Sequence, residues 1–332
     1  MHGQFVWYEL TTPDVDAARR FYPSFTGWGT QQFDKDYTMW TTGGAPFAGI
    51  FKLGPEQRQR GIPPNWMPYV EADNVDETAR LAASLGGKTM VGPQDIPGTG
   101  RFAVLQDPQG AVFGVYKSNQ QPSRAWDGTP QIGRFSWHEL MTTDYQKAFD
   151  FYRRLFGWEK TGEPMDMGGG NQYFMYGKAN KMYGGMFNRM PDMAGMPPFW
   201  MVYIHVNDVN KAVATATKSG GRLHRGPMEI PGGNIAILGD PQGAAFALHD
   251  MKQPATASKP AAKKGAKTAA KKSGTKKRSA AKKRTAAKRT ATKKRPVARK
   301  GAAKRRTTAK RRTTAKKATR AKRATKRRRQ RR

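Results

Sequence analysis

The stretch Trp7-Tyr8-Glu9-Leu10-Thr11-Thr12-Pro13-Asp14 occurs twice in this chain of 332 residues, because Trp137-His138-Glu139-Leu140-Met141-Thr142-Thr143-Asp144 repeats it 130 positions later. The repetition continues in order towards the end of each copy. Matching landmarks are Phe21-Tyr22 with Phe151-Tyr152, Gly27-Trp28 with Gly157-Trp158, Trp66 with Trp200, and Asp107-Pro108-Gln109-Gly110 with Asp240-Pro241-Gln242-Gly243. Rare residues in a preserved order indicate an internal duplication, and a repeat of this length is stronger evidence for the fold than any local secondary-structure pattern. The sequence therefore predicts two copies of one domain.

Each copy reads as two modules with the order strand, helix and three strands. In the first copy, residues 4–11 alternate large apolar and polar side chains, which predicts a strand with Phe5, Trp7 and Glu9 on one face. Asp14 is expected to cap the following helix and Gly27 to end it. The same order restarts at Trp66 within the copy. The predicted fold class is therefore α+β, with two βαβββ modules in each of two tandem domains.

The net charge of +36 comes from one end of the chain. Residues 251–332 contain 37 Lys or Arg and no Asp or Glu, whereas the preceding residues hold 23 basic residues against all 24 acidic ones. Composition therefore divides the chain into a first domain at 1–117, a polar linker at 118–133, a second domain at 134–251 and a basic tail at 252–332. Because the tail has no aromatic residue, it is expected to stay disordered when free.

The basic tail predicts nucleic acid as a partner. Dense positive charge releases counterions from a polyanion, and a tail without aromatic side chains lacks platforms for stacking bases, so we expect sequence-independent contact with the backbone of DNA. RNA remains an alternative, and a membrane surface is not expected because no apolar face accompanies the charge. The tail resembles those of linker histones (H1) and bacterial histone-like proteins in composition only. Expected phosphate contacts are Lys304, Arg305, Arg306, Lys310, Arg311, Arg312, Arg327, Arg328 and Arg329.

Several protein classes are excluded by what the sequence lacks. The absence of cysteine excludes disulfides, thiolate metal sites and cysteine nucleophiles. The start of the chain shows no charged segment followed by an apolar run, and no stretch approaches the roughly 18 apolar residues that a membrane span requires. We expect a cytoplasmic protein, associated with the nucleoid if the host is bacterial.

The order of a first strand, an Asp-capped helix ending in Phe-Tyr and Gly-Trp, and a late Asp-Pro-Xaa-Gly hairpin resembles the vicinal oxygen chelate superfamily. That superfamily includes glyoxalase I, extradiol dioxygenases and bleomycin-resistance proteins. The resemblance covers residues 4–250 and points to tandem members whose repeats begin Trp-Xaa-Glu-Leu. It implies a cup-shaped half-barrel in each domain and a divalent metal held by four side chains. In this sequence, the four metal positions fall on Trp7 and Trp137, near Gly49 and Gly185, on Met67 and Met201, and on Gly114 and Ala247.

None of these side chains is a donor that Zn, Ni, Fe or Mn prefers, so the resemblance implies the fold without the usual metal chemistry. No cofactor is expected. A divalent metal would need a non-standard site in the second domain, where Glu139, His205 and His249 are the available donors.

Glu9 and Glu139 are the catalytic candidates because strand alternation places each on the face of the vacant ligand position. Burial would raise the pKa of such a carboxyl group, as a general base requires. The alternative, which we favour at this point, is that each Glu accepts hydrogen bonds from backbone or tyrosines and fixes the domain. The tryptophans likewise belong either to the core or to a cleft for a flat apolar molecule. The expected pocket residues are Trp7, Trp66, Tyr69, Trp137, Trp200, Tyr203 and His205.

Two functional hypotheses follow. The first is a binding protein whose metal-free domains hold a small apolar or aromatic molecule while the tail holds nucleic acid. The second is a lyase, isomerase or dioxygenase that uses Glu9 or Glu139 as the base, with or without a metal at a non-standard place.

Overall fold

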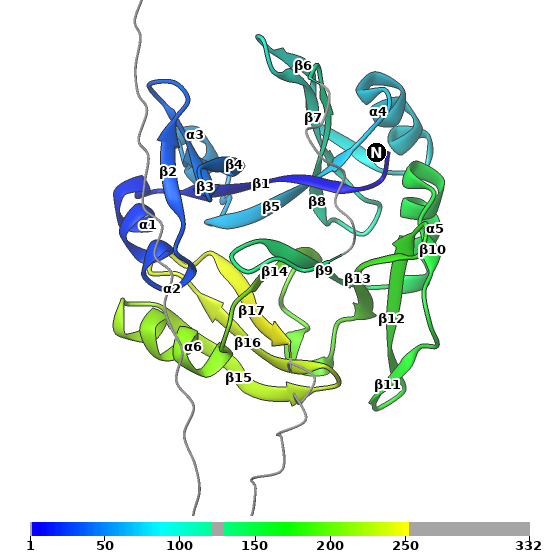
Figure 1. Ribbon diagram of the computed structural model, residues 1–332. Coiled ribbons are helices and arrows are strands. Elements are labelled where there is room, and N and C mark those ends of the chain that lie inside the picture. Colours follow the sequence, from blue (N-terminus) through cyan, green and yellow to red (C-terminus); the bar gives the residue numbers. More distant parts are fainter. Residues whose placement is uncertain (1, 121–128, 252–332) are drawn as a thin grey trace, which may run out of the picture. The chain divides into compact units, whose positions relative to one another are not determined.

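The structure is a computed structural model that describes residues 2–120 and 129–251, so the basic tail and its expected phosphate contacts lie outside the described residues. Each repeat forms its own sheet, and Figure 1 shows both. The first domain comprises β1 (Phe5–Thr12), α1 (Val15–Phe21), α2 (Pro23–Thr26), β2 (Gly29–Gln32), β3 (Tyr37–Thr42), β4 (Ala45–Lys52), α3 (Pro55–Gln59), β5 (Asn65–Glu71), α4 (Val75–Ser84), β6 (Lys88–Ile96), β7 (Gly100–Gln106) and β8 (Val112–Ser118). The second comprises β9 (Phe135–Thr142), α5 (Tyr145–Phe156), β10 (Glu159–Lys160), β11 (Met165–Gly168), β12 (Asn171–Lys178), β13 (Lys181–Asn188), the 3-10 turn η1 (Pro191–Met193), β14 (Phe199–His205), α6 (Val209–Lys218), β15 (Arg222–Ile230), β16 (Gly233–Gly239) and β17 (Ala245–Met251).

The two sheets have the same topology. Strand order is β2-β3-β4-β1-β5-β8-β7-β6 in the first and β10-β12-β13-β9-β14-β17-β16-β15 in the second, where β11 also pairs with β12. The first strands of the two modules, β1 and β5, are antiparallel neighbours, and each is parallel to the last strand of its own module. The predicted α+β class, with paired βαβββ modules in tandem domains, is confirmed.

Matching helices of the two repeats differ where their sequences differ. Asp14 and Asp144 cap α1 and α5 by accepting the backbone N–H three residues later. In the first repeat Pro23 follows Tyr22 and begins the separate short helix α2, whereas Arg153 at the equivalent place lets α5 continue to Phe156. Proline supplies no N–H and clashes with the preceding turn, so it begins a helix more readily than it continues one.

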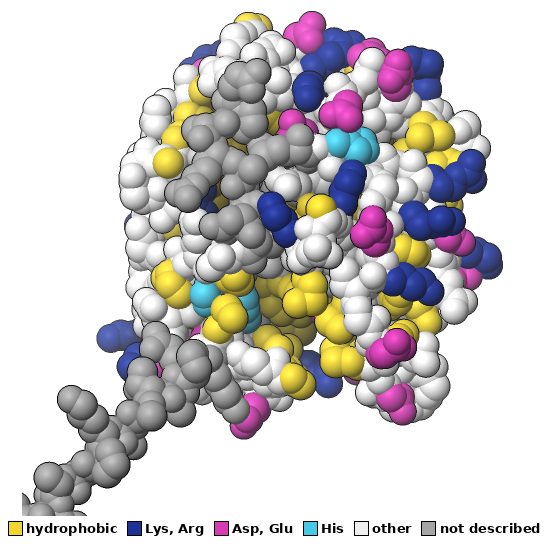
Figure 2. Space-filling view, turned by 45° about the vertical axis from the view of Figure 1, so that its right-hand side comes forward, with side chains coloured by type: hydrophobic (Ala, Val, Ile, Leu, Met, Phe, Trp, Pro, Cys, Tyr) yellow, Lys and Arg dark blue, Asp and Glu magenta, His cyan; other side chains and the backbone are white. Residues whose placement is uncertain are grey.

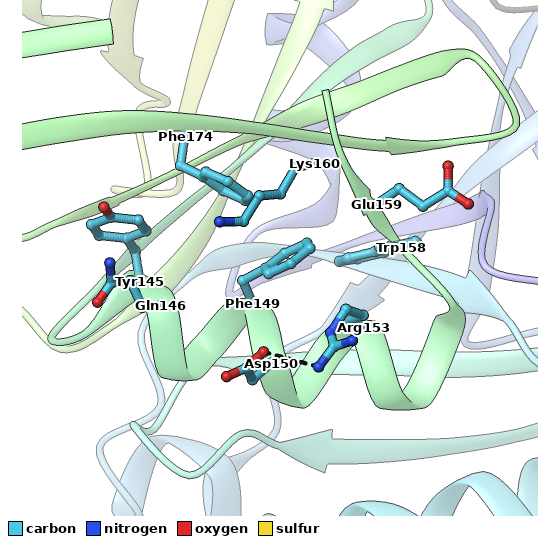
Figure 3. A pocket seen from close by; sticks show the side chains of 9 residues that line it. All are labelled: Tyr145, Gln146, Phe149, Asp150, Arg153, Trp158, Glu159, Lys160 and Phe174. Carbon is cyan, nitrogen blue, oxygen red and sulfur yellow. Dashed lines mark hydrogen bonds and ion pairs between the residues drawn. The ribbon is translucent and has the colours of Figure 1, made fainter. Parts of the chain in front are cut away.

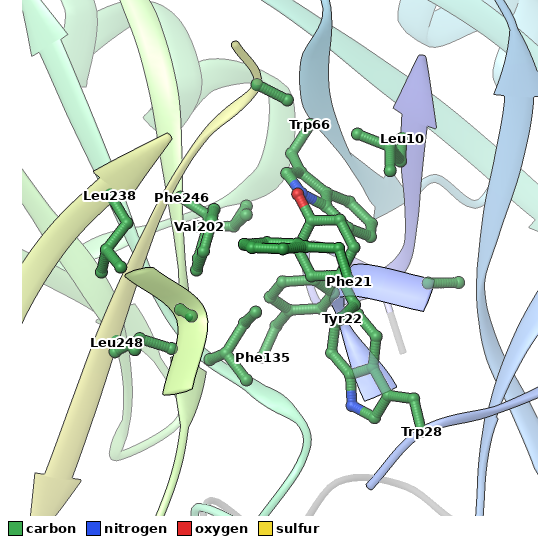
Figure 4. Close-up of a cluster of buried hydrophobic side chains, with 14 of the residues drawn as sticks. Leu10, Phe21, Tyr22, Trp28, Trp66, Phe135, Val202, Leu238, Phe246 and Leu248 are labelled. Atoms are coloured by element: carbon green, nitrogen blue, oxygen red, sulfur yellow. The ribbon is translucent and has the colours of Figure 1, made fainter. Parts of the chain in front are cut away.

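The two large hydrophobic cores each contain side chains from both domains. One core packs α1, α2 and β1 of the first domain against α6, β14 and β17 of the second. The other packs α4, β7 and β8 of the first domain against α5, β12 and β13 of the second. Figure 4 shows the first of these cores, in which Tyr22 and Trp66 lie near Phe246 and Phe135. The first module therefore completes the fourth, and the second completes the third.

Two buried hydrogen-bond chains link the domains reciprocally. Trp66 Nε1 donates to Tyr22 Oη at 2.8 Å, and Tyr22 Oη donates to Asp240 Oδ2 at 3.0 Å. The equivalent hydrogen bonds start in the second domain and end in the first. Trp200 Nε1 donates to Tyr152 Oη at 3.1 Å, and Tyr152 Oη donates to Asp107 Oδ2 at 3.0 Å. The other oxygen of Asp107 accepts the N–H groups of its own turn at Gln109, Gly110 and Ala111.

The repeated Gly-Trp pair also serves the interface. Trp28 Nε1 donates to the Gly133 carbonyl and Trp158 Nε1 to the Gly3 carbonyl, both at 2.7 Å. Between the first strands, Tyr8 meets its own repeat partner, His138, with 2.6 Å between Tyr8 Oη and His138 Nε2. The motifs that reveal the duplication therefore bind the two domains to each other.

One face assignment from the sequence is wrong. Phe5 was expected beside Trp7 and Glu9, but the pairing of β1 with β5 shifts between Phe5 and Trp7. This β-bulge turns Phe5 to the other face, where its ring stacks on His138 with 3.7 Å between centroids. Strict alternation holds only from Trp7 onward.

No helix among residues 2–120 and 129–251 is both long enough and apolar enough to cross a membrane.

Candidate functional site

The first candidate site is the face of the first sheet that carries Glu9, which we call the first cup and define by Trp7, Glu9, Tyr37, Met67 and Tyr69. Glu9 on β1 lies in register with Gly49 on β4 and Met67 on β5, while Trp7 pairs with Tyr69. Tyr37 Oη donates to one oxygen of Glu9 at 3.1 Å and Tyr69 Oη to the other at 3.5 Å. Trp7 Nε1 donates to Tyr37 Oη at 3.0 Å. The result is a carboxylate held between two tyrosines and backed by a tryptophan.

The second cup repeats this arrangement and is defined by Trp137, Glu139, Tyr173, Met201 and Tyr203. Trp137 Nε1 donates to Tyr173 Oη at 2.7 Å, and Glu139 accepts hydrogen bonds from Tyr173 and Tyr203. Both glutamates are half-buried. Hydrophobic side chains gather in a hollow in the lower half of Figure 2, with histidine beside it.

The electrostatics of the two cups follow from burial. Burial is the main cause that raises the pKa of Glu9 and of Glu139 above the ordinary range, and the tyrosine hydrogen bonds act in the opposite direction. Burial and the neighbouring carboxylate raise the pKa of Tyr37 and of Tyr173, so both tyrosines remain neutral donors. Each phenol donates its single proton to the glutamate, so each cup offers a ligand carboxyl oxygens as acceptors, and a phenol becomes a donor to the ligand when it turns from the glutamate.

Glycines at the family's metal positions make room for these tyrosines. A Cβ atom at Gly49 would overlap the Tyr37 hydroxyl group, and one at Gly185 would overlap the ring of Tyr173. Gly114 has the same relation to the ring of Tyr69. A metal-binding side chain at any of these places would collide with a tyrosine ring.

The residues at the metal positions therefore do not fit the metal that the fold family implies. The first cup presents an indole, a thioether and two glycines there, and tyrosine rings occupy the space above the glycines. Across the part of the chain that the structure describes, no three His, Asp or Glu side chains come together as metal ligands. The suggested grouping of Glu139, His205 and His249 as a non-standard site is not formed.

Trp66 and Trp200 were expected to line the cups, and the structure places both in the cores instead. Trp66 pairs with Leu10, whereas the next residue, Met67, pairs with Glu9. Trp200 pairs with Leu140 in the same way. Both indoles are 4% exposed, and both donate to core tyrosines. Neighbouring residues in a strand point to opposite faces, so a tryptophan three residues from a cup tyrosine cannot share its face.

The other predicted site residues gather as the alternation indicated. Trp7 and Tyr69 lie in the first cup, and Trp137 and Tyr203 lie in the second. His205 lies farther along β14, with its ring 4.8 Å from that of His249. His249 Nε2 is hydrogen-bonded to Ser136 Oγ.

Tyr37 and Tyr173 were not predicted as site residues from the sequence. Tyr37 makes the shorter hydrogen bond to Glu9, and Tyr173 accepts the hydrogen bond from the Trp137 indole. A signal was present, because each tyrosine precedes a metal-position glycine, Gly49 or Gly185, by the same number of residues. Repeated aromatic residues on a strand next to a repeated glycine are typical of a ring that packs over backbone.

A separate groove of about 570 Å³ lies outside the cups, along α5 and the edge strand β10. Figure 3 shows Phe149 and Trp158 at its base and Lys160 over Phe174, with the Lys160 Nζ atom 5.1 Å from the ring centroid. Its acidic and basic side chains, Asp150, Arg153, Glu159 and Lys160, stand exposed at the surface. We therefore place the candidate chemistry in the cups, where the carboxylates are held by tyrosines.

Tandem paired-βαβββ domains with duplicated cups define a class, and comparison with known families gives the same class. Residues 132–248 match the Glyoxalase/Bleomycin resistance protein/Dioxygenase superfamily, and residues 7–116 match a glyoxalase-like domain. The chain belongs to this superfamily.

Among individual relatives, the protein CFP32 of Mycobacterium tuberculosis, which carries the provisional name of a glyoxylase, is 32% identical over 251 residues, covering 73% of this chain and 92% of the relative. The anthracycline biosynthesis protein DauV of Streptomyces sp. strain C5 is 29% identical over 267 residues, covering 76% and 94%.

Solved structures share the fold at low sequence identity. The Mn(II)-bound glyoxalase from Novosphingobium aromaticivorans superposes with a TM-score of 0.53 at 16% identity, over 75% of this chain and 82% of that one. The 2,3-dioxygenase LapB from Pseudomonas sp. KL28 gives 0.54 at 12% identity, over 76% and 96%. At these identities the likeness concerns the fold alone.

Proposed function

We propose that this protein binds small flat aromatic or apolar molecules in its two cups without a metal. The observation that carries the proposal is the occupation of the metal positions: glycines admit tyrosine rings, and the tyrosines and a tryptophan surround one carboxylate in each cup. Aromatic walls with a few convergent polar groups suit a ligand that is mostly apolar with a hydroxyl or carbonyl edge. The relative DauV is named as an anthracycline biosynthesis protein, which is consistent with a ligand of this kind.

Native mass spectrometry of residues 1–251, purified without a chelator, tests the proposal. The described residues all belong to one compact unit, so this piece is suitable for the measurement. We expect a metal-free mass that gains up to two molecules of an added planar quinone. A stoichiometric metal would overturn the proposal.

A matched pair of substitutions locates the ligand. Tyr37→Phe and Tyr173→Phe each remove a phenol that positions a cup glutamate and can turn to donate to the ligand, and each should weaken quinone binding by up to about tenfold, since one hydrogen bond contributes roughly 0.5–1.5 kcal/mol. Tyr145→Phe, whose exposed hydroxyl group donates to Gln172, serves as the control and should have no effect.

A second candidate function is catalysis by Glu9 or Glu139 as a general base. The half-buried carboxylate with a raised pKa favours it, because a base poised nearer neutral pH transfers protons more effectively. Lyase, isomerase and dioxygenase-type reactions are the candidates that the superfamily offers. Glu9→Gln and Glu139→Gln should then abolish turnover of a bound ligand while the protein stays folded. Unchanged turnover in the double variant would exclude both carboxylates as the base.

The basic tail, residues 252–332, is proposed to hold the protein on nucleic acid. Its 37 Lys and Arg residues follow a part of the chain that is close to neutral. The full chain should bind duplex DNA with an affinity that falls steeply as salt rises, and residues 1–251 should lose this binding. Salt-sensitive binding that survives in residues 1–251 would move the assignment to the folded domains. Competition with RNA distinguishes the two polyanions.

A further inference from the structure

The two cups share their carboxylate and tyrosines but differ along one wall, and the first difference is a charge. Arg225 on β15 lies in register with Ile237 on β16, and Ile237 packs against the apolar cluster formed by Met201, Tyr203 and Ala247. Side chains directly opposite each other on neighbouring strands share a face, so Arg225 lies on the face of the second cup. Its positive charge acts on both Glu139 and Tyr203.

The first cup has no such charge. At the equivalent place on β6, Val91 pairs with Val104, as Arg225 pairs with Ile237. Val91 is 39% exposed, so this position of the first cup is an accessible apolar surface.

The second difference lies where β14 and β17 run side by side. In the second domain His205 pairs with His249, and the ring of His249 lies 6.4 Å from Tyr203 while its Nε2 atom meets the Ser136 hydroxyl group. In the first domain the equivalent pair is Glu71 and Tyr116. Tyr116 donates to the Thr99 carbonyl at 3.1 Å, and Glu71 lies 3.6 Å from the Lys117 ammonium group.

The charges decide which ligand each wall favours. In the second cup Arg225 offsets Glu139, and both histidines are neutral because burial lowers the pKa of His205 and lowers that of His249 to about 4. In the first cup, among residues 2–120 and 129–251, no cation is one of the groups that shift the pKa of Glu9, and the charge of Glu71 is matched by Lys117. Asp250, which acts on both histidines, stands where the first domain has Lys117, so the two cups differ in where their charges lie: a positive charge, Arg225, acts on the carboxylate of the second cup, and Val91 takes its place in the first.

We propose that the second cup is selective for aromatic ligands that carry an acidic group, a carboxylate or an ionised phenol, and that the first cup takes neutral ones. Arg225 meets the anion, and His249, whose Nε2 atom is hydrogen-bonded to Ser136, stands near Tyr203 on the same wall. This inference rests on the proposed binding function and adds its ligand class. An arginine beside a carboxylate-bearing ligand forms a planar, charge-assisted contact that a valine cannot supply.

The experiment uses the full chain at physiological salt with two probes of one shape, anthraquinone-2-carboxylate and anthraquinone-2-carboxamide. Binding is followed by quenching of tryptophan fluorescence. We expect carboxylate quenching to persist in Trp7→Phe and to be largely lost in Trp137→Phe, which assigns the acidic probe to the second cup. The basic tail contains no tryptophan, so a probe on the tail leaves this difference unchanged.

Exchange of the wall residues then tests the charge. Arg225→Val, which copies the first cup, should weaken carboxylate binding by about tenfold and change carboxamide binding less than about twofold, as loss of a single charged partner predicts. Val91→Arg should strengthen carboxylate binding at the first cup by a similar factor, and it keeps the test decisive if Arg225→Val misfolds. Lys218→Ala removes one exposed positive charge on α6 and should change neither affinity.

Equal carboxylate affinity in the wild type, Arg225→Val and Val91→Arg, with both probes still bound, would overturn the charge selectivity and leave the binding function standing. Failure of both probes to quench any tryptophan would overturn the binding function together with this inference.

Discussion

The two faces of each sheet use the duplicated sequence differently. On the face that meets the other domain, the hydrogen bonds of the repeated tyrosines and tryptophans come in twins: Tyr22 with Asp240 matches Tyr152 with Asp107, and Trp28 with Gly133 matches Trp158 with Gly3. On the cup face the carboxylate and tyrosines are repeated, but the wall is not. Residues that bind one repeat to the other must match because each contact is made twice, whereas a wall residue meets only its own ligand.

The largest effect should come from the interface tryptophans. Trp158→Ala removes an indole that is 1% exposed and its hydrogen bond to Gly3, and should lower the free energy of unfolding by about 3–5 kcal/mol. Trp28→Ala should cost a similar amount. Urea unfolding followed by circular dichroism measures both. A loss below about 1 kcal/mol in either variant would show that the two interface tryptophans do not stabilise the fold equally.

Lowering the pH should destabilise the folded protein through His138, which is buried at the interface between the domains. His138 Nδ1 lies 2.8 Å from the Tyr183 carbonyl, which only accepts, so Nδ1 carries the proton and Nε2 accepts from Tyr8. Burial lowers the pKa of His138 to about 3 in the folded protein. The unfolded chain takes up a proton below about pH 6.5 and the folded one does not, so stability is lost as pH falls from there.

The slope that His138 contributes is about 1.4 kcal/mol per pH unit. Carboxyl groups with raised folded pKa, such as Asp107 and Asp240, act with the opposite sign over part of this range, so the difference between variants is the quantity to measure. Stability of the wild type should fall more steeply between pH 6.5 and 4.5 than that of His138→Gln. His224→Gln, at an exposed strand position, should retain the wild-type slope.

Loss of a single interface hydroxyl group should have a smaller effect. Tyr22→Phe leaves Trp66 Nε1 without its acceptor and removes one donor from Asp240, and should cost about 1–3 kcal/mol. Tyr152→Phe is its twin and should match it. Denaturant midpoints for the two variants check the equality, with Tyr145→Phe, which removes an exposed hydroxyl group from a partly buried ring, as the reference.

The smallest effect on stability is expected in the cups. Glu9→Gln removes the cost of keeping a carboxylate half-buried and still offers an oxygen to Tyr37, so unfolding free energy should change by less than about 1 kcal/mol. Glu139→Gln should behave alike. Thermal unfolding measures this, and a drop as large as that of Tyr22→Phe would show that the glutamates hold the fold, as our architectural interpretation of the sequence had it.

The fold could be predicted because rare residues recur in order, and strand alternation placed most of each cup correctly. Prediction failed where alternation was broken or misapplied. The bulge after Phe5 depends on how β1 meets β5, which the local pattern does not contain. Trp66 was assigned to the cup although it lies an odd number of residues from Tyr69, and its register with Leu10 places it in the core. Arg225 gave no signal, because its importance appears only when β15 is paired with β16 and compared with Val91 on β6.

The shared cores also bear on how the molecule comes apart. Each core takes helices and strands from both repeats, so neither repeat retains a closed core when the other unfolds. Despite its duplicated sequence, residues 1–251 should therefore melt as one cooperative unit, with a calorimetric enthalpy equal to the van't Hoff value. A ligand bound in one cup would then raise the melting temperature of the whole unit, including the cup that it never touches.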